Sequence, residues 1–363
     1  MSSEPLPNPH IVSLKGYVPG EQPQGGGWIK LNTNENPYPP SPRVVAAIKK
    51  HLETDGAALR LYPSPDSAPL RKAIAALHGY NADNIVVGNG SDDILNLLVR
   101  SYADLNRPIG LLDPSYSLYP IIAAIQGASV VKVPITPDFS LDINAIVNCR
   151  APIFFLTNPN APLGISFSAK NVEELAQVFS GILVVDEAYA DFAEEDCTPL
   201  PLKYPNVVVT RTLSKSYSLA GMRVGYALCS PKVAEILHRV RDSYNVDRLA
   251  QVAAVAALED REWVHKNIEK IKTTRTRLIS ELTQLGWKIN PSSGNFILAK
   301  PRSKTHEFSS ATAESAFNFL KEHKILVRCF PHHPLTEKSL RISVGTDAEM
   351  DAFLKAARAW SEG

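Results

Sequence analysis

Short apolar runs alternate with amphipathic segments between residues 43 and 245, and this alternation limits the folds that are open to the chain. The apolar runs are rich in β-branched residues and lie at 84–87, 109–112, 129–133, 152–156, 182–185, 207–209 and 224–228. Segments with helical spacing, such as 92–100 and 169–178, separate several of them. Buried strands that alternate with helices predict an α/β fold with a mostly parallel, seven-stranded sheet flanked by helices. Ligands of such sheets bind at the carboxyl ends of the strands.

A chain of 363 residues is too long for one ordinary core, so we expect more than one domain. Two further regions flank the predicted sheet. Residues 1–42 are rich in Pro, Gly and Asn and are predicted to form an extended N-terminal arm that packs with the smaller domain or a partner subunit. Residues 43–247 form the predicted large domain. Residues 248–363 are predicted to form a linking helix and a smaller α/β domain, with strands at 295–298, 325–327 and 340–343 and a last helix from about 348 to 360.

The overall composition excludes several classes of function. The formal net charge is +1, which gives no electrostatic reason to expect nucleic acid or an anionic membrane surface as a partner. No apolar run is long enough to cross a bilayer, and the first residues lack the segments of a signal peptide, so we expect a cytoplasmic protein. The four cysteines are far apart, and His332-His333 has no nearby carboxylate, so we expect no metal.

A lysine among small hydroxylic residues, Lys215, follows the apolar run at 207–209. A buried ammonium is costly unless it is paired or neutralised, so a lysine beside a core strand calls for a reason. A desolvated lysine amine forms a Schiff base with an aldehyde, and pyridoxal phosphate is the commonest such aldehyde in enzymes. The simpler alternative is a surface lysine in a serine-rich turn.

The segment 88–93, Gly-Asn-Gly-Ser-Asp-Asp, follows the first apolar run and opens a helical segment. Backbone amides and the helix dipole at such a start form a cradle for an anion. The same residues are also an ordinary helix cap. The segment lacks the lysine of a P-loop and the full dinucleotide-binding pattern, which argues against a nucleotide-dependent enzyme.

Three other predicted strands end in polar loops. Asp186 comes directly after a buried strand, where it needs a cationic partner, and a protonated pyridine nitrogen is one such partner. Asn160 lies in a loop made rigid by two prolines and a glycine, from which it can hydrogen-bond a ring hydroxyl. Tyr116 can stack on a planar ring. Each residue taken alone also has a structural explanation, as a cap, a turn residue or part of the core.

The order of these features resembles that of the fold-type I pyridoxal-phosphate enzymes, and of the aminotransferases in particular. The features are an anion cradle, an aromatic residue, an Asn loop, an Asp-x-x-Tyr pair, a lysine and an arginine. The resemblance runs from about residue 31 to 345 and implies that Lys215 forms the Schiff base and that Asp186 pairs with the pyridine nitrogen. It implies that Tyr189 and Asn160 hydrogen-bond the ring oxygen and that Tyr116 stacks on the ring. The residues that it places around the phosphate are Gly90, Ser91, Asp92, Thr212, Ser214 and Arg223.

Segments outside this core are similar to those of the histidinol-phosphate aminotransferases; they are 30–38, 59–65, 325–328 and 340–346. This resemblance implies amino-group exchange between histidinol phosphate and 2-oxoglutarate, with glutamate as the other amino donor, in histidine biosynthesis. It implies a homodimer in which Tyr62 reaches the cofactor phosphate of the neighbouring subunit, and an arm residue, Tyr17, that closes over the substrate. Arg328 and Arg341 are then expected to bind the substrate phosphate or carboxylate, since guanidinium binds either anion.

The chain departs from the usual pattern of these relatives at Leu61, where they often have Arg, at Ser64, where they often have Asp, and around Tyr17. These positions border the substrate pocket, so related activities stay open. They are an aminotransferase for aromatic amino acids and a threonine-phosphate decarboxylase. A non-catalytic regulator that binds pyridoxal phosphate is an alternative of another class, against which the intact lysine and arginines argue.

Overall fold

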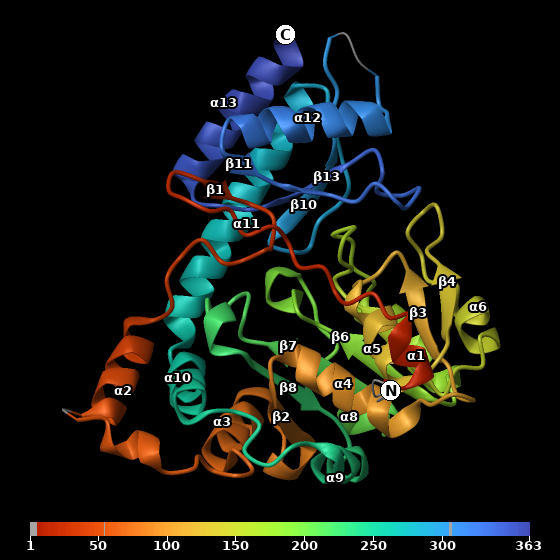
Figure 1. The fold of residues 1–363 in the computed structure, drawn as a ribbon, viewed down its shortest axis with the longest axis vertical. Coiled ribbons are helices and arrows are strands. Elements are labelled where there is room, and N and C mark those ends of the chain that lie inside the picture. The colour runs from red at the N-terminus through yellow and green to blue at the C-terminus, as the bar shows by residue number, and fades with distance from the viewer. Residues whose placement is uncertain (1–5, 54, 305–306) are drawn as a thin grey trace, which may run out of the picture.

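The structure, a computed structural model, describes residues 6–53, 55–304 and 307–363. A seven-stranded sheet lies in the larger part of the molecule, the lower part in Figure 1. The strand order is β2-β8-β7-β6-β5-β3-β4. β8 runs antiparallel to both of its neighbours, and the other strands are parallel to one another. The strands are β2 (Ile85–Asn89), β3 (Ile109–Asp113), β4 (Val130–Pro134), β5 (Ile153–Thr157), β6 (Ile182–Asp186), β7 (Val207–Thr212) and β8 (Val224–Leu228). The predicted fold class and the mostly parallel sheet are confirmed.

Helices cover both faces of this sheet, which explains why its strands are continuous apolar runs. In β5, Phe154 and Leu156 belong to the core on one face, and Ile153 and Phe155 to the core on the other. The first core includes residues of α2 (Pro42–Leu52), α3 (Ala68–His78), α6 (Ile143–Asn148), α7 (Ala169–Val178), α8 (Leu200–Lys203) and α10 (Arg248–Glu259). The second includes residues of α4 (Ser91–Tyr102), α5 (Leu118–Gln126) and α9 (Pro231–Val240).

Local sequence sets several helix starts. The side chains of Ser41 and Ser230 each accept a hydrogen bond from a backbone amide of the first turn, and a proline occupies the first turn after each of them. Thr346 and Glu349 form a capping box at the start of the last helix. Short 3₁₀ turns lie at Ala57–Arg60, Ala82–Asn84, Ala190–Phe192 and Ala220–Met222.

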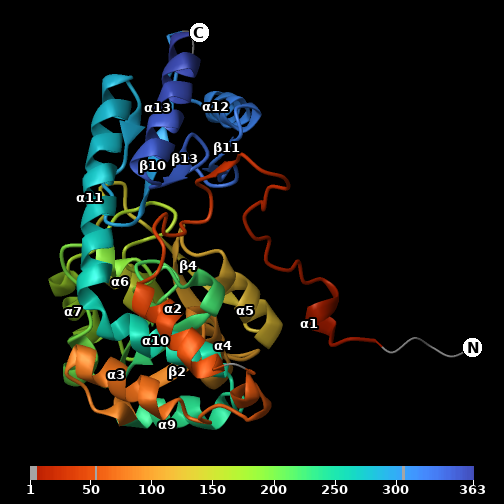
Figure 2. The same cartoon turned by 90° about the vertical axis from the view of Figure 1, so that its left-hand side faces the viewer.

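A second body is built on a four-stranded antiparallel sheet with the order β12-β13-β10-β9. Its elements are β9 (Lys288–Ile289), β10 (Phe296–Lys300), β12 (Arg328–Cys329), β13 (Leu340–Ser343), α12 (Ser310–Glu322) and α13 (Asp347–Glu362). The long helix α11 (Arg261–Gln284) joins the two bodies (Figures 1 and 2). Its Ile268 packs in a cluster with Tyr189 of the first body, whereas its Leu278 lies in the core of the second body.

The structure differs from the sequence-based expectation in two segments. The predicted strand at 325–327 is two short strands, because the chain passes from β11 (Ile325–Leu326) to β12, which belongs to a different sheet. The predicted extended arm contains a short helix, α1 (Pro9–Val12), and a strand, β1 (Ile29–Lys30), that pairs in parallel with β11. Figure 2 shows the arm running along the outside of the molecule from β1 to α1, which packs against α5.

None of the helices in the described part of the chain combines the length and the apolar character needed to span a membrane. The division into ranges 1–42, 43–247 and 248–363 stays a prediction.

Candidate active site

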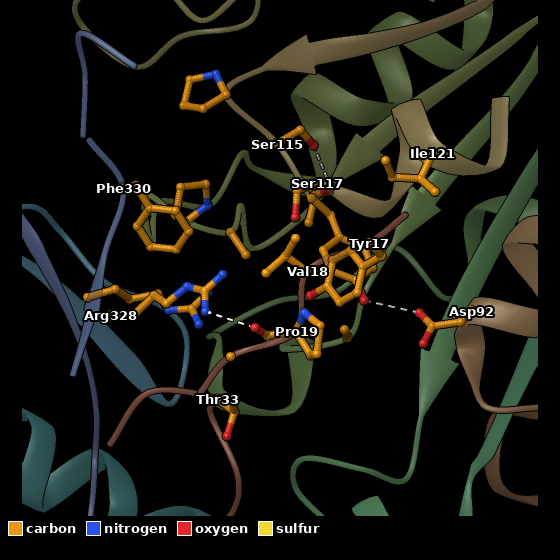
Figure 3. Close-up of a pocket in the computed structure, with 18 of the residues that line it drawn as sticks. Tyr17, Val18, Pro19, Thr33, Asp92, Ser115, Ser117, Ile121, Arg328 and Phe330 are labelled. Carbon is orange, nitrogen blue, oxygen red and sulfur yellow. Dashed lines mark hydrogen bonds between the residues drawn. The ribbon is translucent and has the colours of Figure 1, made fainter. Parts of the chain in front are cut away.

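A cavity of about 940 Å³ lies at the carboxyl edge of the large sheet and is also lined by the arm and by the second body (Figure 3). Most of the residues that the sequence singled out line it. They are Tyr17, Ser91, Asp92, Tyr116, Asp186, Tyr189, Thr212, Ser214, Lys215, Arg223, Arg328 and Arg341. Of the predicted site residues, Gly90, Asn160 and Tyr62 are not among the lining residues.

The sheet topology explains why residues far apart in sequence meet here. Thr157, Asp186 and Thr212 are the last residues of the neighbouring parallel strands β5, β6 and β7. The antiparallel strand β8 starts at the same edge, directly after Arg223. The carboxyl edge of the sheet therefore collects the polar residue that ends each strand.

Asp186 is a buried carboxylate that only neutral groups contact. Tyr119 Oη donates a hydrogen bond of 2.6 Å to one carboxylate oxygen, and Thr210 Oγ1 donates one of 3.1 Å to the other. Burial raises the pKa of Asp186 to about 6, although these two hydrogen bonds lower it. Since no Lys, Arg or His of the described residues forms an ion pair with it, the carboxylate is suited to a cationic ligand.

Lys215 presents its amine to the cavity from the loop that follows β7. Its Nζ donates a hydrogen bond of 3.1 Å to the backbone oxygen of Thr33 and lies 5.7 Å from the centre of the Tyr189 ring. Asn36 Nδ2 donates to the backbone oxygens of Lys215 and Ser216, at 3.1 Å each. The loop that carries the amine is thus held in place, and the amine itself has no carboxylate partner among the residues described.

A helix start and an arginine lie close together where β2 meets α4. Gly90 has a φ of 83°, and a Cβ atom at this position would lie 2.5 Å from Arg223 Nη2, so only glycine fits there without displacing the arginine. The helix starts at Ser91, whose first amides point out of the helix end. Arg223 Nη1 lies 3.4 Å from Ser214 Oγ, and its Nη2 lies 3.3 Å from Asp92 Oδ2. The helix start, the hydroxyl and the guanidinium face the same end of the cavity.

Tyr116 and the arm close another side of the cavity. Tyr116 Oη donates to Asp92 Oδ1 at 3.3 Å, and the rings of Tyr116 and Tyr17 meet edge to face with centres 6.2 Å apart. In Figure 3, arm residues Tyr17 and Pro19 lie between Asp92 on one side and Arg328 on the other. The arm therefore covers the cavity in this conformation.

Two arginines of the second body face the cavity without a carboxylate partner. Arg341 Nη2 donates to the backbone oxygen of Asn32 at 2.9 Å, its Nε is buried with no hydrogen-bond partner, and burial lowers the pKa of its guanidinium. Arg328 Nη1 donates to the backbone oxygen of Pro19 at 3.3 Å. Within the described chain, neither guanidinium forms an ion pair, so both are available to an anionic ligand.

The remaining predicted residues lie in other surroundings. Asn160 is fully buried, and its amide bonds the backbone oxygen of Pro114 and the backbone nitrogen of Leu163. Tyr189 Oη accepts a hydrogen bond of 3.0 Å from Asn34 Nδ2. Tyr62 lies in a separate surface hollow, is 77% exposed, and stacks on Tyr244 with ring centres 4.5 Å apart. The roles predicted for these three residues stay predictions.

A buried charge network lies behind the lysine loop. Arg211 Nη1 is 2.7 Å from Glu187 Oε2, and both side chains are buried. Arg211 also pairs with Asp191, which accepts a hydrogen bond from Ser216, the residue after Lys215. Thr210 and Arg211 point to opposite sides of β7, so one contacts Asp186 and the other Glu187.

Sequence reasoning missed this network and the hydroxyls around Asp186. Because side chains alternate between the two faces of a strand, the sequence at the polar end of β7 could have predicted that Thr210 and Arg211 point to opposite sides. Tyr119 lies in the first turn of α5, and nothing local links it to Asp186.

The geometry as a whole suits one ligand with three features. The lysine amine can react with an electrophilic carbon, the buried carboxylate can pair with a cation, and the helix start with its arginine can bind an anion. The guanidinium groups of Arg328 and Arg341, on the other side of the cavity, can bind a second anion.

Comparison with known proteins agrees with this interpretation. The family model described as "Aminotransferase class I and II" matches residues 26–356. The histidinol-phosphate aminotransferase of Geobacter sulfurreducens is 47% identical over 350 residues, which cover 96% of this chain and 97% of that protein. The histidinol-phosphate aminotransferase of Synechocystis sp. is 45% identical over 349 residues, with 96% of each chain covered.

A solved structure is similar over almost the whole chain. The crystal structure of histidinol-phosphate aminotransferase from Sinorhizobium meliloti in complex with pyridoxal 5'-phosphate superposes with a TM-score of 0.86 at 28% identity. The superposition covers 97% of this chain and 96% of that one.

Proposed function

Because this chain belongs to the class I and II aminotransferases and, within them, to the histidinol-phosphate aminotransferase family, we propose that it transfers an amino group between histidinol phosphate and 2-oxoglutarate with pyridoxal phosphate as its cofactor. This is a step of histidine biosynthesis. One observation supports the cofactor above the others: a lysine amine and a buried carboxylate without a cation line the same cavity.

The residues present fit pyridoxal phosphate. We propose that Lys215 binds its aldehyde, that Asp186 pairs with its pyridine nitrogen, and that Ser91, Ser214 and Arg223 hold its phosphate. When bound, this cofactor acts as an electron sink for the carbon that carries the substrate amine. We propose that Tyr116, which lines the cavity, covers the planar ring; Tyr189 lies beside the lysine amine.

We propose two tasks for the Lys215 amine. It fixes the cofactor covalently, and once the substrate amine has replaced it, it removes the proton from the substrate Cα. The hydrogen bonds from Asn36 to the backbone of the lysine loop support this proposal, because they leave the side chain free to move while the backbone stays fixed.

The guanidinium groups of Arg328 and Arg341, which form no ion pair among the described residues, support an anionic substrate at the other end of the cavity. Histidinol phosphate carries a phosphate and no carboxylate, whereas glutamate carries carboxylates. One arginine pair can bind either anion through its fork of donors, so we propose that the same pair serves both half-reactions.

The proposed reaction is tested by incubating the purified protein with 2-oxoglutarate and one amino donor at a time and measuring glutamate. We expect kcat/KM for histidinol phosphate to exceed that for phenylalanine by about 100-fold, because only the former brings a phosphate to the arginines. Equal rates would favour an aromatic aminotransferase. Carbon dioxide release from threonine phosphate would favour the decarboxylase.

Arg341→Ala is expected to lower kcat/KM by about 100-fold for histidinol phosphate and for glutamate alike, since both anions lose the same partly buried guanidinium. Steady-state kinetics with each donor measures this. Arg302→Ala is the matched control, because Arg302 pairs with Glu307 outside the cavity and its loss should leave both values unchanged. A variant that loses only one donor would contradict a shared anion site.

We also propose that the protein is a homodimer in which Tyr62 serves the neighbouring subunit. Tyr62 does not line the cavity of its own subunit but lines a separate surface hollow. It lies in an exposed apolar stretch with Leu59 and Leu61, each of which is 54% exposed. Exposed apolar residues that gather in one place are typical of an interface. A cytoplasmic location is proposed as well, and the four free cysteines support it.

Mixing two inactive variants tests the shared site. Tyr62→Ala and Lys215→Ala homodimers should each be impaired, whereas a hybrid dimer has one cavity with both residues intact. After denaturation and joint refolding, we expect up to about a quarter of wild-type activity, since about half of the dimers are hybrids with one good site. Activity that stays at the level of the separate variants at every mixing ratio would argue against the exchange.

A further inference from the structure

A chain of hydroxyl groups leads from the cavity wall to the buried side of Asp186. Ser115 Oγ lies 2.9 Å from Thr157 Oγ1, which lies 2.7 Å from Tyr119 Oη, which lies 2.6 Å from Asp186 Oδ2. Figure 3 shows Ser115, at the cavity end of this chain, with its bond drawn as a dashed line. Ser115, Thr157 and Asp186 line the cavity, and Tyr119 lies fully buried behind them.

The direction of the protons along this chain follows from the charge of Asp186. An ionised carboxylate only accepts hydrogen bonds, so the single hydroxyl proton of Tyr119 must point to it. Tyr119 Oη must then accept from Thr157, and Thr157 must accept from Ser115. All three hydroxyl dipoles point towards the carboxylate, and such aligned bonds strengthen one another.

Packing does not explain the Tyr119 hydroxyl. The ring lies in an apolar core and stacks on Phe155 with centres 4.8 Å apart, which a phenylalanine would also do. The hydroxyl contacts only Asp186 and Thr157 among the residues described. A buried hydroxyl is costly without partners, so its presence points to the carboxylate that it serves.

We propose that Tyr119, supported by Thr157 and Ser115, is a positioning residue that keeps Asp186 an ionised carboxylate directed at the pyridine nitrogen. The inference rests on the proposed function, because it needs pyridoxal phosphate in the cavity. Thr210, on the neighbouring strand, donates to the other carboxylate oxygen of Asp186. The negative charge of the nearby Asp92 disfavours the ionised form of Asp186, so the hydrogen-bond donors are needed to stabilise that form. Without Tyr119, the proton that Asp186 and the ring nitrogen share should move towards the carboxylate.

The test uses pyridoxal phosphate labelled with ¹⁵N in its ring, bound to the wild type and to Tyr119→Phe at one fixed pH. In the wild type we expect the ¹⁵N chemical shift of a protonated pyridine. In the variant we expect a shift towards the neutral value and cofactor binding about tenfold weaker or more, as for the loss of a hydrogen bond to a charged group. Thr157→Val, which keeps the tyrosine and removes the donor behind it, should show a smaller change in the same direction.

Tyr204→Phe is the matched control, because Tyr204 Oη also donates to a carboxylate, that of Glu173, away from the cavity. It should leave the ¹⁵N shift unchanged. If Tyr119→Phe does not fold, the ¹⁵N shift of Thr157→Val tests the proposal in its place. A wild-type ¹⁵N shift in the folded variants would overturn the role of Tyr119 and leave the proposed function standing, whereas a wild-type protein that takes up no cofactor would overturn both.

Discussion

Lys215→Ala is expected to abolish the covalent attachment of pyridoxal phosphate and to lower kcat by about 10⁴-fold, because we propose that one side chain supplies both the bond to the cofactor and the base for the substrate Cα. The Lys215 amine is a good candidate for both tasks, since its only hydrogen bond in the described structure goes to the backbone oxygen of Thr33. Borohydride reduction followed by peptide mass spectrometry measures the attachment, and a transamination assay measures the rate.

Lys203→Ala is the control for this variant. Lys203 lies in α8, outside the cavity, and pairs with Glu173 at the surface. It should keep both the covalent bond and the rate. A reducible bond that persists in Lys215→Ala would mean that another lysine carries the cofactor, and the assignment of the whole site would fall with it.

Arg211→Met is expected to lower the free energy of unfolding by about 3–5 kcal/mol, as when one partner of a buried ion pair is removed. Methionine retains much of the side-chain length, so the main loss is the charge that neutralises Glu187 and Asp191. Burial raises the pKa of Glu187, and the Arg211 charge lowers it. In the variant, the raised pKa is unopposed, so an ionised Glu187 becomes costlier as the pH rises, and the loss of stability should be larger at pH 8 than at pH 6.

Urea unfolding of the cofactor-free protein at both pH values measures this, since a bound cofactor would add its own stabilisation. The control is Arg239→Met, which breaks an exposed pair with Glu235 on one helix and should cost about 0.5 kcal/mol or less. A loss as small as the control's, or one that does not grow with pH, would show that the network behind the lysine loop contributes little.

Local patterns in the sequence predict where several of the cavity residues lie. A continuous apolar run that ends in a polar residue marks the carboxyl end of a parallel strand, so the pattern of residues alone places Asp186 and the loop of Lys215 at one edge of the sheet. The glycine pattern before Ser91 likewise predicts an anion cradle, because a left-handed glycine and a helix start are both local features.

Contacts between distant segments are not predictable in this way. Tyr119 and Asp186 are 67 residues apart, and the spacing of Tyr119 within α5 is that of any core aromatic. The split between β11 and β12 depends on the arm, whose strand β1 pairs with β11 from almost 300 residues away. Such pairings depend on tertiary packing, which cannot be predicted from the helix or strand propensity of a segment.

The central claim is tested most directly by a single half-reaction. The enzyme loaded with pyridoxal phosphate is mixed with histidinol phosphate, phenylalanine or threonine phosphate, without any acceptor, and the cofactor absorbance is followed. We predict that histidinol phosphate converts the cofactor to its amine form about 100-fold faster than phenylalanine does, because we propose that its phosphate binds Arg328 and Arg341, which line the cavity. No conversion by histidinol phosphate, with rapid conversion by phenylalanine or carbon dioxide release from threonine phosphate, would contradict the account.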